Sequence, residues 1–73
     1  MYILSQDKKN LINFDNFHEL FVDEGVIWAR VFSMDKKISV KLGEYGSNEE
    51  AEKEFEDIQD SLCDENVGMH LVE

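Results

Sequence analysis

The sequence predicts a small two-layer α+β domain, an antiparallel β-meander of about five short strands packed on one C-terminal amphipathic helix. Residues 1–46 hold short apolar runs separated by turn residues, and residues 47–65 carry apolar side chains at helical spacing. The 73 residues include no proline and no glycine-rich linker, which favours one continuous domain. A chain this short has a marginal core, so oligomerisation remains an open source of stability.

The strands are expected where apolar runs lie between turn signals. Glu24-Gly25 is typical of a tight hairpin turn, Asp15-Asn16 is turn chemistry, and Met34–Lys37 separates the last two runs. The last run alternates, with its apolar residues Ile38, Val40 and Leu42 on one face. The expected strands are Tyr2–Ser5, Leu11–Phe14, Phe17–Asp23, Val26–Ser33 and Ile38–Leu42.

The helix is expected over residues 47–65. Ser47 followed by Glu50 is a capping-box pattern, in which the serine hydroxyl accepts from the Glu50 amide and the glutamate reaches back. Asn66 and Gly68 are suitable stop signals, and residues 66–73 then form a terminal strand or tail. The expected buried stripe lies within roughly 60° on the helical wheel. It consists of Ala51, Phe55, Ile58 and Leu62.

The two faces of the strand Val26–Ser33 differ in residue size. Ile27, Ala29 and Val31 suit packing under the helix, whereas the alternate positions point to the face that the helix leaves open. An arginine between two aromatic residues on an open face is typical of an interface. Strand twist or a folded-over N-terminal hairpin is the alternative that would cover them. The open-face residues are Trp28, Arg30 and Phe32.

Charge is concentrated in the second half of the chain. The net charge is −10, with six acids and six bases in residues 1–43 but ten acids and one base in residues 44–65. This balance opposes direct binding to nucleic acid or to anionic lipid. Six carboxylates are expected opposite the buried stripe, spread over about 22 Å of helix, close to the phosphate spacing of a single nucleic-acid strand. The surface is therefore either a solvated face or a docking surface for a basic protein. Its residues are Glu49, Glu50, Glu56, Asp57, Asp60 and Asp64.

Residue types that carry chemistry are few. His18 and His70 belong to no recognisable nucleophile motif, and Cys63 lies near the expected helix C-terminus, where the dipole disfavours a thiolate. We expect no catalytic residues, no metal site and no cofactor. The chain has no apolar run of the length of a membrane span and no signal-peptide core, so we expect a cytoplasmic protein with no membrane partner.

Short motifs scattered over most of the chain carry a resemblance: Leu4-Ser5-Gln6-Asp7-Lys8, Ile12-Asn13-Phe14-Asp15-Asn16, Leu42-Gly43-Glu44-Tyr45, Glu49-Glu50-Ala51 and a terminal Met69. In these the chain resembles small uncharacterised proteins of phages, prophages and chromosomes of Gram-positive bacteria. Those relatives carry Met-Pro near the end and a more basic helix, whereas here His70 follows Met69 and the helix is acidic. The resemblance implies a phage-type origin and a strand-meander-plus-helix fold, and it transfers no active site.

Three hypotheses for function follow. The first is a non-enzymatic phage-type protein that inhibits or modulates a basic host nuclease, polymerase or defence effector through the acidic helix, as anti-CRISPR or anti-restriction proteins do, in the host cytoplasm if phage-encoded. The second is a homo-oligomeric adaptor, for instance a homodimer, that pairs through its sheet face. The third is a binder that sequesters a small signalling nucleotide, using cations from several subunits. Those cations are Lys8, Lys9, Arg30, Lys36 and Lys37.

Overall fold

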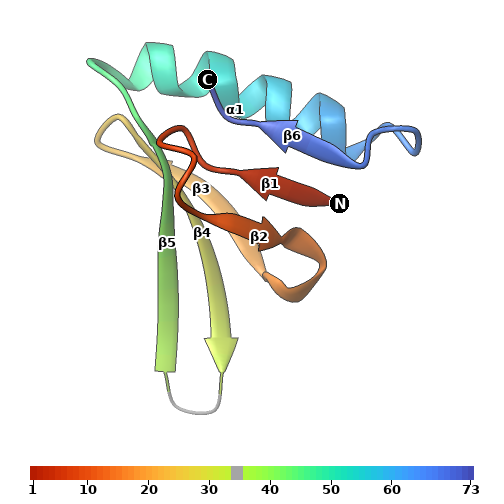
Figure 1. The fold of residues 1–73 in the computed structure, drawn as a ribbon. Coiled ribbons are helices and arrows are strands. Elements are labelled where there is room, and N and C mark those ends of the chain that lie inside the picture. Colours follow the sequence, from red (N-terminus) through yellow and green to blue (C-terminus); the bar gives the residue numbers. More distant parts are fainter. Residues whose placement is uncertain (34–35) are drawn as a thin grey trace.

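The protein has the expected α+β composition, with six strands, one α-helix and one short 3-10 helix among the described residues (Figure 1). The structure is a computed structural model that describes residues 1–33 and 36–73. The turn expected at Met34–Lys37 therefore lies partly outside the described residues. In chain order the elements are β1 (Tyr2–Leu4), β2 (Leu11–Asn13), η1 (Phe14–Asn16), β3 (Glu19–Asp23), β4 (Val26–Ser33), β5 (Lys36–Glu44), α1 (Asn48–Leu62) and β6 (Met69–Leu71).

The strands form two sheets instead of one, and only β3, β4 and β5 form the expected antiparallel meander. The small sheet has the order β2-β1-β6, and the large sheet has the order β3-β4-β5. In the small sheet β1 pairs antiparallel with β2 but parallel with β6. A parallel partner needs a long crossover connection, and here the whole large sheet and α1 lie between β1 and β6 in sequence.

The break between the sheets lies at η1. The Asn13 side chain accepts a hydrogen bond from the Asp15 amide at 3.1 Å, and the Phe17 amide donates to the Phe14 carbonyl at 3.0 Å. These bonds turn the backbone out of the extended conformation, so β2 ends at Asn13 rather than Phe14. The next strand begins at Glu19 and pairs with β4 rather than with β2.

The turn between β3 and β4 lies at the expected Glu24-Gly25. Both residues have positive φ, 50° and 77°, as the tight turns that suit the twist of a hairpin require. The turn is also attached to the start of α1, because the Gly25 amide donates to the Asn48 side chain and the Gly25 carbonyl accepts from the Tyr45 amide. This connection fixes where α1 starts relative to the large sheet.

Helix α1 begins where the sequence predicts and ends earlier. The Ser47 hydroxyl caps it by accepting from the Glu50 amide at 3.2 Å. The return bond of a capping box, from the Ser47 amide to the Glu50 carboxylate, is not among the hydrogen bonds of the described residues. The helix stops at Leu62 instead of residue 65, because the Asp64 carboxylate and carbonyl accept from the Asn66 and Val67 amides and form a turn.

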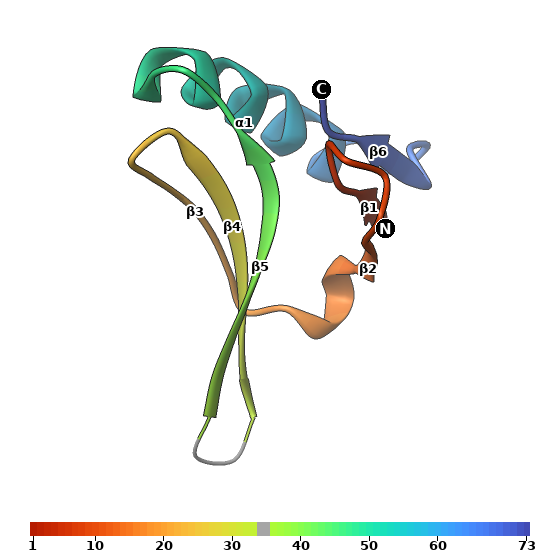
Figure 2. The same cartoon turned by 60° about the vertical axis from the view of Figure 1, so that its left-hand side comes forward.

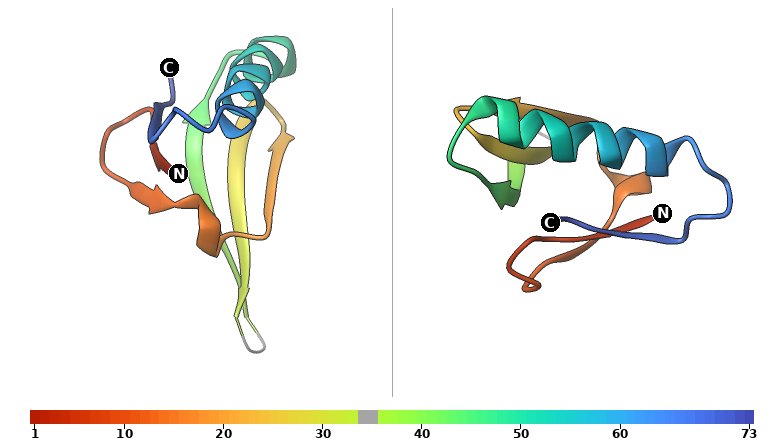
Figure 3. Two further views of the ribbon diagram at one scale, coloured as in Figure 1. Left: turned by 90° about the vertical axis from the view of Figure 1, so that its right-hand side faces the viewer. Right: turned by 90° about the horizontal axis from the view of Figure 1, so that it is seen from above.

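The core lies between the concave face of the large sheet and the two parts that cover it, α1 and the small sheet. Figure 2 shows the large sheet curving around one end of α1 and the small sheet, and Figure 3 shows β6 running alongside α1. The far end of the β4–β5 hairpin extends beyond both of these elements. The buried apolar residues are Ile3, Ile12, Ile27, Ala29, Leu42, Ala51, Ile58 and Val72.

Five residues expected in the core are less buried than predicted, and of these Val31 and Val40 on the large sheet are partly buried. Ile38 is 47% exposed because it lies in the part of β5 that extends past the helix. On α1, Leu62 is 38% exposed and Phe55 is partly buried, while Glu54 is buried. The buried side of the helix is thus rotated towards Glu54, which faces β6. No helix in the described part of the chain is long and apolar enough to cross a membrane.

Candidate partner-binding surface

The acidic face of α1 is a continuous exposed surface. All six predicted carboxylates are exposed, and five of them lie within the helix, whereas Asp64 lies just beyond its end. Glu52, which the sequence analysis did not include in this face, is exposed as well. Ala51, Glu54 and Ile58 are buried on the other side of the same helix, so packing against the body of the protein holds the acidic face outward.

These carboxylates are not neutralised within the chain. None of the ion pairs among the described residues involves one of the six. Lys53 is the one base in α1, whereas Glu52, Glu56 and Asp60 follow one another at i,i+4 spacing. Like charges at this spacing destabilise a helix by about 0.2–0.5 kcal/mol per pair. The face is therefore a local cost to stability, which a partner of opposite charge would relieve.

The second predicted surface lies on the outer face of the large sheet. Trp28 and Arg30 are half-buried there, and the side chain of Phe32 lies outside the described part of the structure. The Arg30 guanidinium stacks over the Phe21 ring at 4.4 Å and pairs with Glu19 at 3.1 Å. These cross-strand contacts occupy the Arg30 guanidinium, although its Nε is buried without a hydrogen-bond partner among the described residues. The surface therefore offers an aromatic side chain beside an ion-paired arginine rather than a free cation.

A buried hydrogen-bonded chain joins α1 to β6, and sequence reasoning missed it. Ser61 Oγ lies 2.7 Å from His70 Nδ1, and His70 Nε2 lies 2.9 Å from Glu54 Oε2. The same Glu54 oxygen accepts from the Glu73 amide at 3.0 Å. A signal was present, since Glu54 follows Ala51 by three residues and precedes Ile58 by four, which places a carboxylate beside the apolar stripe.

The chain Ser61–His70–Glu54 contains the residue types of a hydrolase triad, but its setting favours a structural role. Ser61 lies in the last turn of α1, where the unpaired carbonyls create a negative potential that opposes an oxyanion. The exposed carboxylates of α1 add to that potential. Glu54 instead accepts from a backbone amide of the segment that follows β6. These hydrogen bonds therefore fix β6 against the helix.

Tyr45 lies near Glu54 and Glu73, where α1 meets the segment after β6. Burial, and then the carboxylates of Glu54 and Glu73, raise the pKa of Tyr45 to about 12. Its hydroxyl is buried and has no hydrogen-bond partner. The ring fills the space beside Gly43, where an added Cβ would lie 2.8 Å from the Tyr45 hydroxyl oxygen. The close approach of the tyrosine to β5 thus depends on the glycine.

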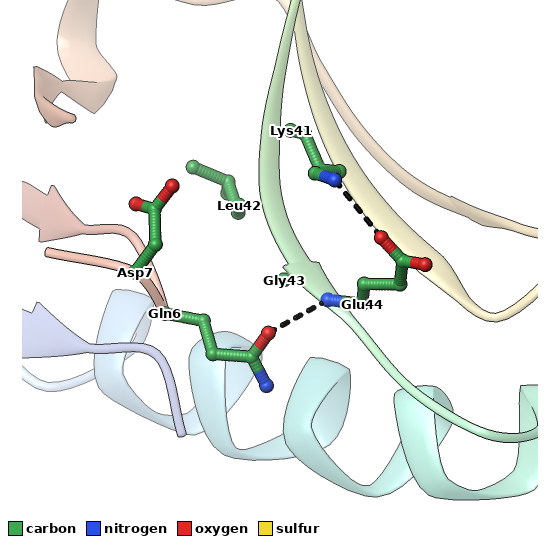
Figure 4. Close-up of a pocket in the computed structure, with 6 residues that line it drawn as sticks. All are labelled: Gln6, Asp7, Lys41, Leu42, Gly43 and Glu44. Carbon is green, nitrogen blue, oxygen red and sulfur yellow. Dashed lines mark hydrogen bonds and ion pairs between the residues drawn. The ribbon is translucent and has the colours of Figure 1, made fainter. Parts of the chain in front are cut away.

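A shallow cleft of about 120 Å³ lies where the β1–β2 turn meets β5 (Figure 4). Gln6 connects the two sides of the cleft. Its side-chain oxygen accepts from the Glu44 backbone amide at 2.9 Å, and its own backbone amide donates to the Leu42 carbonyl at 2.7 Å. Lys41 pairs with Glu44 at 2.9 Å, which raises the pKa of Lys41 and lowers that of Glu44. The cleft is smaller than the usual range of about 300–1,000 Å³ for ligand sites. Of its charged groups, Lys41 and Glu44 pair with each other, and the Asp7 carboxylate accepts from the Ser5 hydroxyl and the Lys9 amide.

The structure does not gather within one chain the described cations of the nucleotide hypothesis. Lys8 and Lys9 lie on the β1–β2 turn, Arg30 lies on the outer face of β4, and Lys37 lies near the start of β5. The side chain of Lys36 is outside the description. Among the described residues, no group of three or more histidine, cysteine, aspartate and glutamate side chains is arranged to hold a metal ion. Comparisons with family models, curated proteins and solved structures yield no match to this chain.

Proposed function

We propose that this protein is a non-enzymatic binding protein that engages a basic partner protein through the acidic face of α1. The observation that supports the proposal is the row of exposed carboxylates on α1, none of which joins an ion pair given for the described residues. A surface kept only for solubility would more easily mix positive and negative charges. Charge attraction over such a face would make association fast and sensitive to salt.

The spacing of the carboxylates indicates the kind of partner. From Glu49 to Asp60 the helix rises about 16 Å. One nucleic-acid strand places about five phosphates over that length, and five of the six predicted carboxylates lie within it. A protein that normally holds a phosphate backbone would present cations at a matching spacing. The proposed partner is therefore a nucleic-acid-handling or defence protein of a host cell, which the helix would inhibit or modulate in the manner of a phage-type inhibitor.

The experiment is a pull-down from a Gram-positive host lysate with wild-type protein and a charge-reversed variant. The variant replaces Glu56, Asp57 and Asp60 by lysine. These side chains lie opposite the buried residues of α1, so their replacement creates no cavity. Wild type should recover a basic nucleic-acid-binding protein, and high salt or excess single-stranded DNA should release it. The variant should recover none.

A matched control distinguishes the helix from net charge. Asp15, Asp23 and Glu24 are also exposed and lie outside α1, so replacing them by lysine changes the charge by the same amount. This control should bind like wild type. Equal loss in both variants would mean that only net charge matters, and unchanged recovery in the helix variant would show that the face is merely solvated. Loss on Trp28→Ala alone, without a change in salt dependence, would instead favour the large-sheet face as the interface.

A further inference from the structure

The outer face of the small sheet carries an apolar grid that the rest of the protein leaves uncovered. The strand registers pair Tyr2 with both Asn13 and Met69, and pair Leu4 with both Leu11 and Leu71. Directly paired residues project to the same face of a sheet, so these six side chains form two rows of three. Five of the six are large and apolar, and none is charged. We call this set the grid.

The opposite face of the small sheet is the one that packs against the body. Ile3 and Ile12 on that face are buried, and the His70 ring contacts Ser61 and Glu54 of α1. The grid therefore points away from α1 and from the large sheet. Tyr2, Leu11, Met69 and Leu71 are 48%, 59%, 55% and 39% exposed.

The exposed area is large for so small a protein. A large side chain has about 200 Å² of surface, so these four residues expose about 400 Å² together. This is within the range of about 300–600 Å² for the largest apolar patch of a typical monomer, and such patches are often functional. A stable interface buries about 800 Å² per partner with little more than half of it apolar. The grid thus supplies the apolar centre that one standard-sized interface needs.

The charged groups at the two ends of the grid differ, because only the Leu4 end has exposed lysines. At the Leu4 end, the β1–β2 turn presents Lys8 and Lys9, while the Asp7 carboxylate turns back to accept from the Ser5 hydroxyl at 2.6 Å and the Lys9 amide at 2.9 Å. These two bonds lower the pKa of Asp7. Glu73 follows β6 at the same end, and its amide donates to Glu54 on α1.

The other end of the grid is acidic. The loop that holds exposed Asp64 and Glu65 enters β6 there, and the Gly68 carbonyl of that loop accepts from the Tyr2 amide at 2.9 Å. Asp15 is exposed at this end too, 3.5 Å from the N-terminal amine. The uncharged grid is therefore bordered at one end by Lys8 and Lys9 together with the carboxylates of Asp7 and Glu73, and at the other end by anions of which Asp15 lies beside the N-terminal amine.

We propose that the grid is a homodimer interface, in which two copies stack their small sheets face to face with the strands running in opposite directions. A two-fold axis in the interface and perpendicular to the strands brings Lys8 and Lys9 of one copy to Asp64 and Glu65 of the other. An axis along the strands would instead place like charges together. Because α1 lies behind the small sheet in each copy, the acidic faces remain apart despite a net charge of −10 per chain.

The first test measures the oligomeric state by sedimentation equilibrium from micromolar to submillimolar concentration. Wild type should dimerise, and Leu11→Gln combined with Met69→Gln should weaken the dimer by at least about a hundredfold, because a two-fold interface loses each side chain twice. Ile38→Gln is the matched control, since Ile38 is similarly exposed at 47% but lies outside the grid. Circular dichroism confirms that each variant is folded. A monomeric wild type, or equal weakening by Ile38→Gln, would overturn the proposal.

The second test uses charge alone and leaves the grid intact. One variant changes Lys8 and Lys9 to glutamate. The other changes Glu65 to lysine and keeps Asp64, whose carboxylate accepts from the Asn66 amide in the turn before β6. Each variant by itself should dimerise weakly, because the attraction between the lysines of one copy and the acidic end of the other is lost, whereas an equimolar mixture should form heterodimers of higher affinity than either homodimer. Homodimers of unchanged strength, or no gain on mixing, would refute the antiparallel arrangement.

The two proposals share Asp64, and variants that leave Asp64 unchanged separate them. Lysine at Glu56, Asp57 and Asp60 should abolish partner capture and leave dimerisation unchanged, since these residues lie on α1 and not on the grid. The Leu11 and Met69 variant should lose dimerisation and still bind the basic partner. Each proposal can therefore be refuted while the other still stands.

Discussion

Replacement of Glu54 by alanine should destabilise the fold far more than replacement of any exposed acid of α1. Glu54 is 8% exposed, and a single carboxylate oxygen accepts from both His70 Nε2 and the Glu73 amide. Both donors lie in or next to β6, whose other attachment is the pairing with β1. The carboxylate is thus a central contact between α1 and the C-terminal strand.

The magnitude follows from the two donors that alanine would leave without an acceptor. Each unsatisfied buried polar group costs about 1–3 kcal/mol. Water can reach the chain end after local rearrangement, so we expect a total loss of about 2–4 kcal/mol. A domain of this size has a free energy of unfolding of only about 5 kcal/mol. The variant should therefore lose about half of its stability or more and melt at a clearly lower temperature than wild type. Glu54→Gln keeps an acceptor oxygen and should cost about 1 kcal/mol.

The assay is urea unfolding followed by Trp28 fluorescence and by far-ultraviolet circular dichroism. Glu56→Ala is the control, because Glu56 lies two residues away on the exposed side of the same helix and should change stability by less than about 0.5 kcal/mol. A double-mutant cycle with His70→Ala should show coupling, since the two side chains contact each other. Equal stability of the Glu54→Ala and Glu56→Ala proteins would refute the assignment of Glu54 as a structural acceptor.

Three further changes test the helix start and the Tyr45 junction. Ser47→Ala removes the acceptor of the Glu50 amide and should cost about 0.5–2 kcal/mol, so an unchanged melting temperature would contradict the assigned cap. Gly43→Ala places a Cβ 2.8 Å from the Tyr45 hydroxyl oxygen and 3.0 Å from Val72, and should cost about 1–3 kcal/mol in chemical denaturation, with partial rescue by Tyr45→Phe. The pKa of Tyr45, about 12 when folded, lies above the unfolded value of about 10. The stability from its neutral phenol is therefore complete below pH 10 and declines as the pH rises through 12. The Tyr45→Phe protein should lack both this decline and the late step in tyrosinate absorbance, and a decline of the same size in that variant would contradict the assignment.

Local chemistry in the sequence was sufficient for several features of the fold. The turn at Glu24-Gly25 and the helix start at Ser47 each depend on a few adjacent residues whose backbone preferences act directly. The alternation in β4 was also predicted, since Ile27 and Ala29 are buried while Trp28 faces outward. Such features involve contacts between neighbours in sequence, so a short pattern contains the information that determines them.

Pairing between distant strands was decided only by the tertiary structure. The bonds of η1 separate β2 from β3, and the parallel partner of β1 comes from the opposite end of the chain. The acidic face could be predicted because it lies on one helix and repeats with a single period. The Ser61–His70–Glu54 contacts could not, because they bring together α1 and β6.

The apolar grid likewise has features that the sequence predicts and features that only the tertiary structure decides. Tyr2 and Leu4 alternate in a single short strand, and such a pattern is too brief to indicate which face is covered. Met69 and Leu71 become their neighbours only when β6 joins β1, and Leu11 only when the first hairpin closes. The sequence therefore shows which residues are apolar, but only the register of the three strands brings them together into one uncharged exposed face. That register depends on burial of Ile3 and Ile12 on the other side of the sheet, a free-energy gain that no local segment can realise alone.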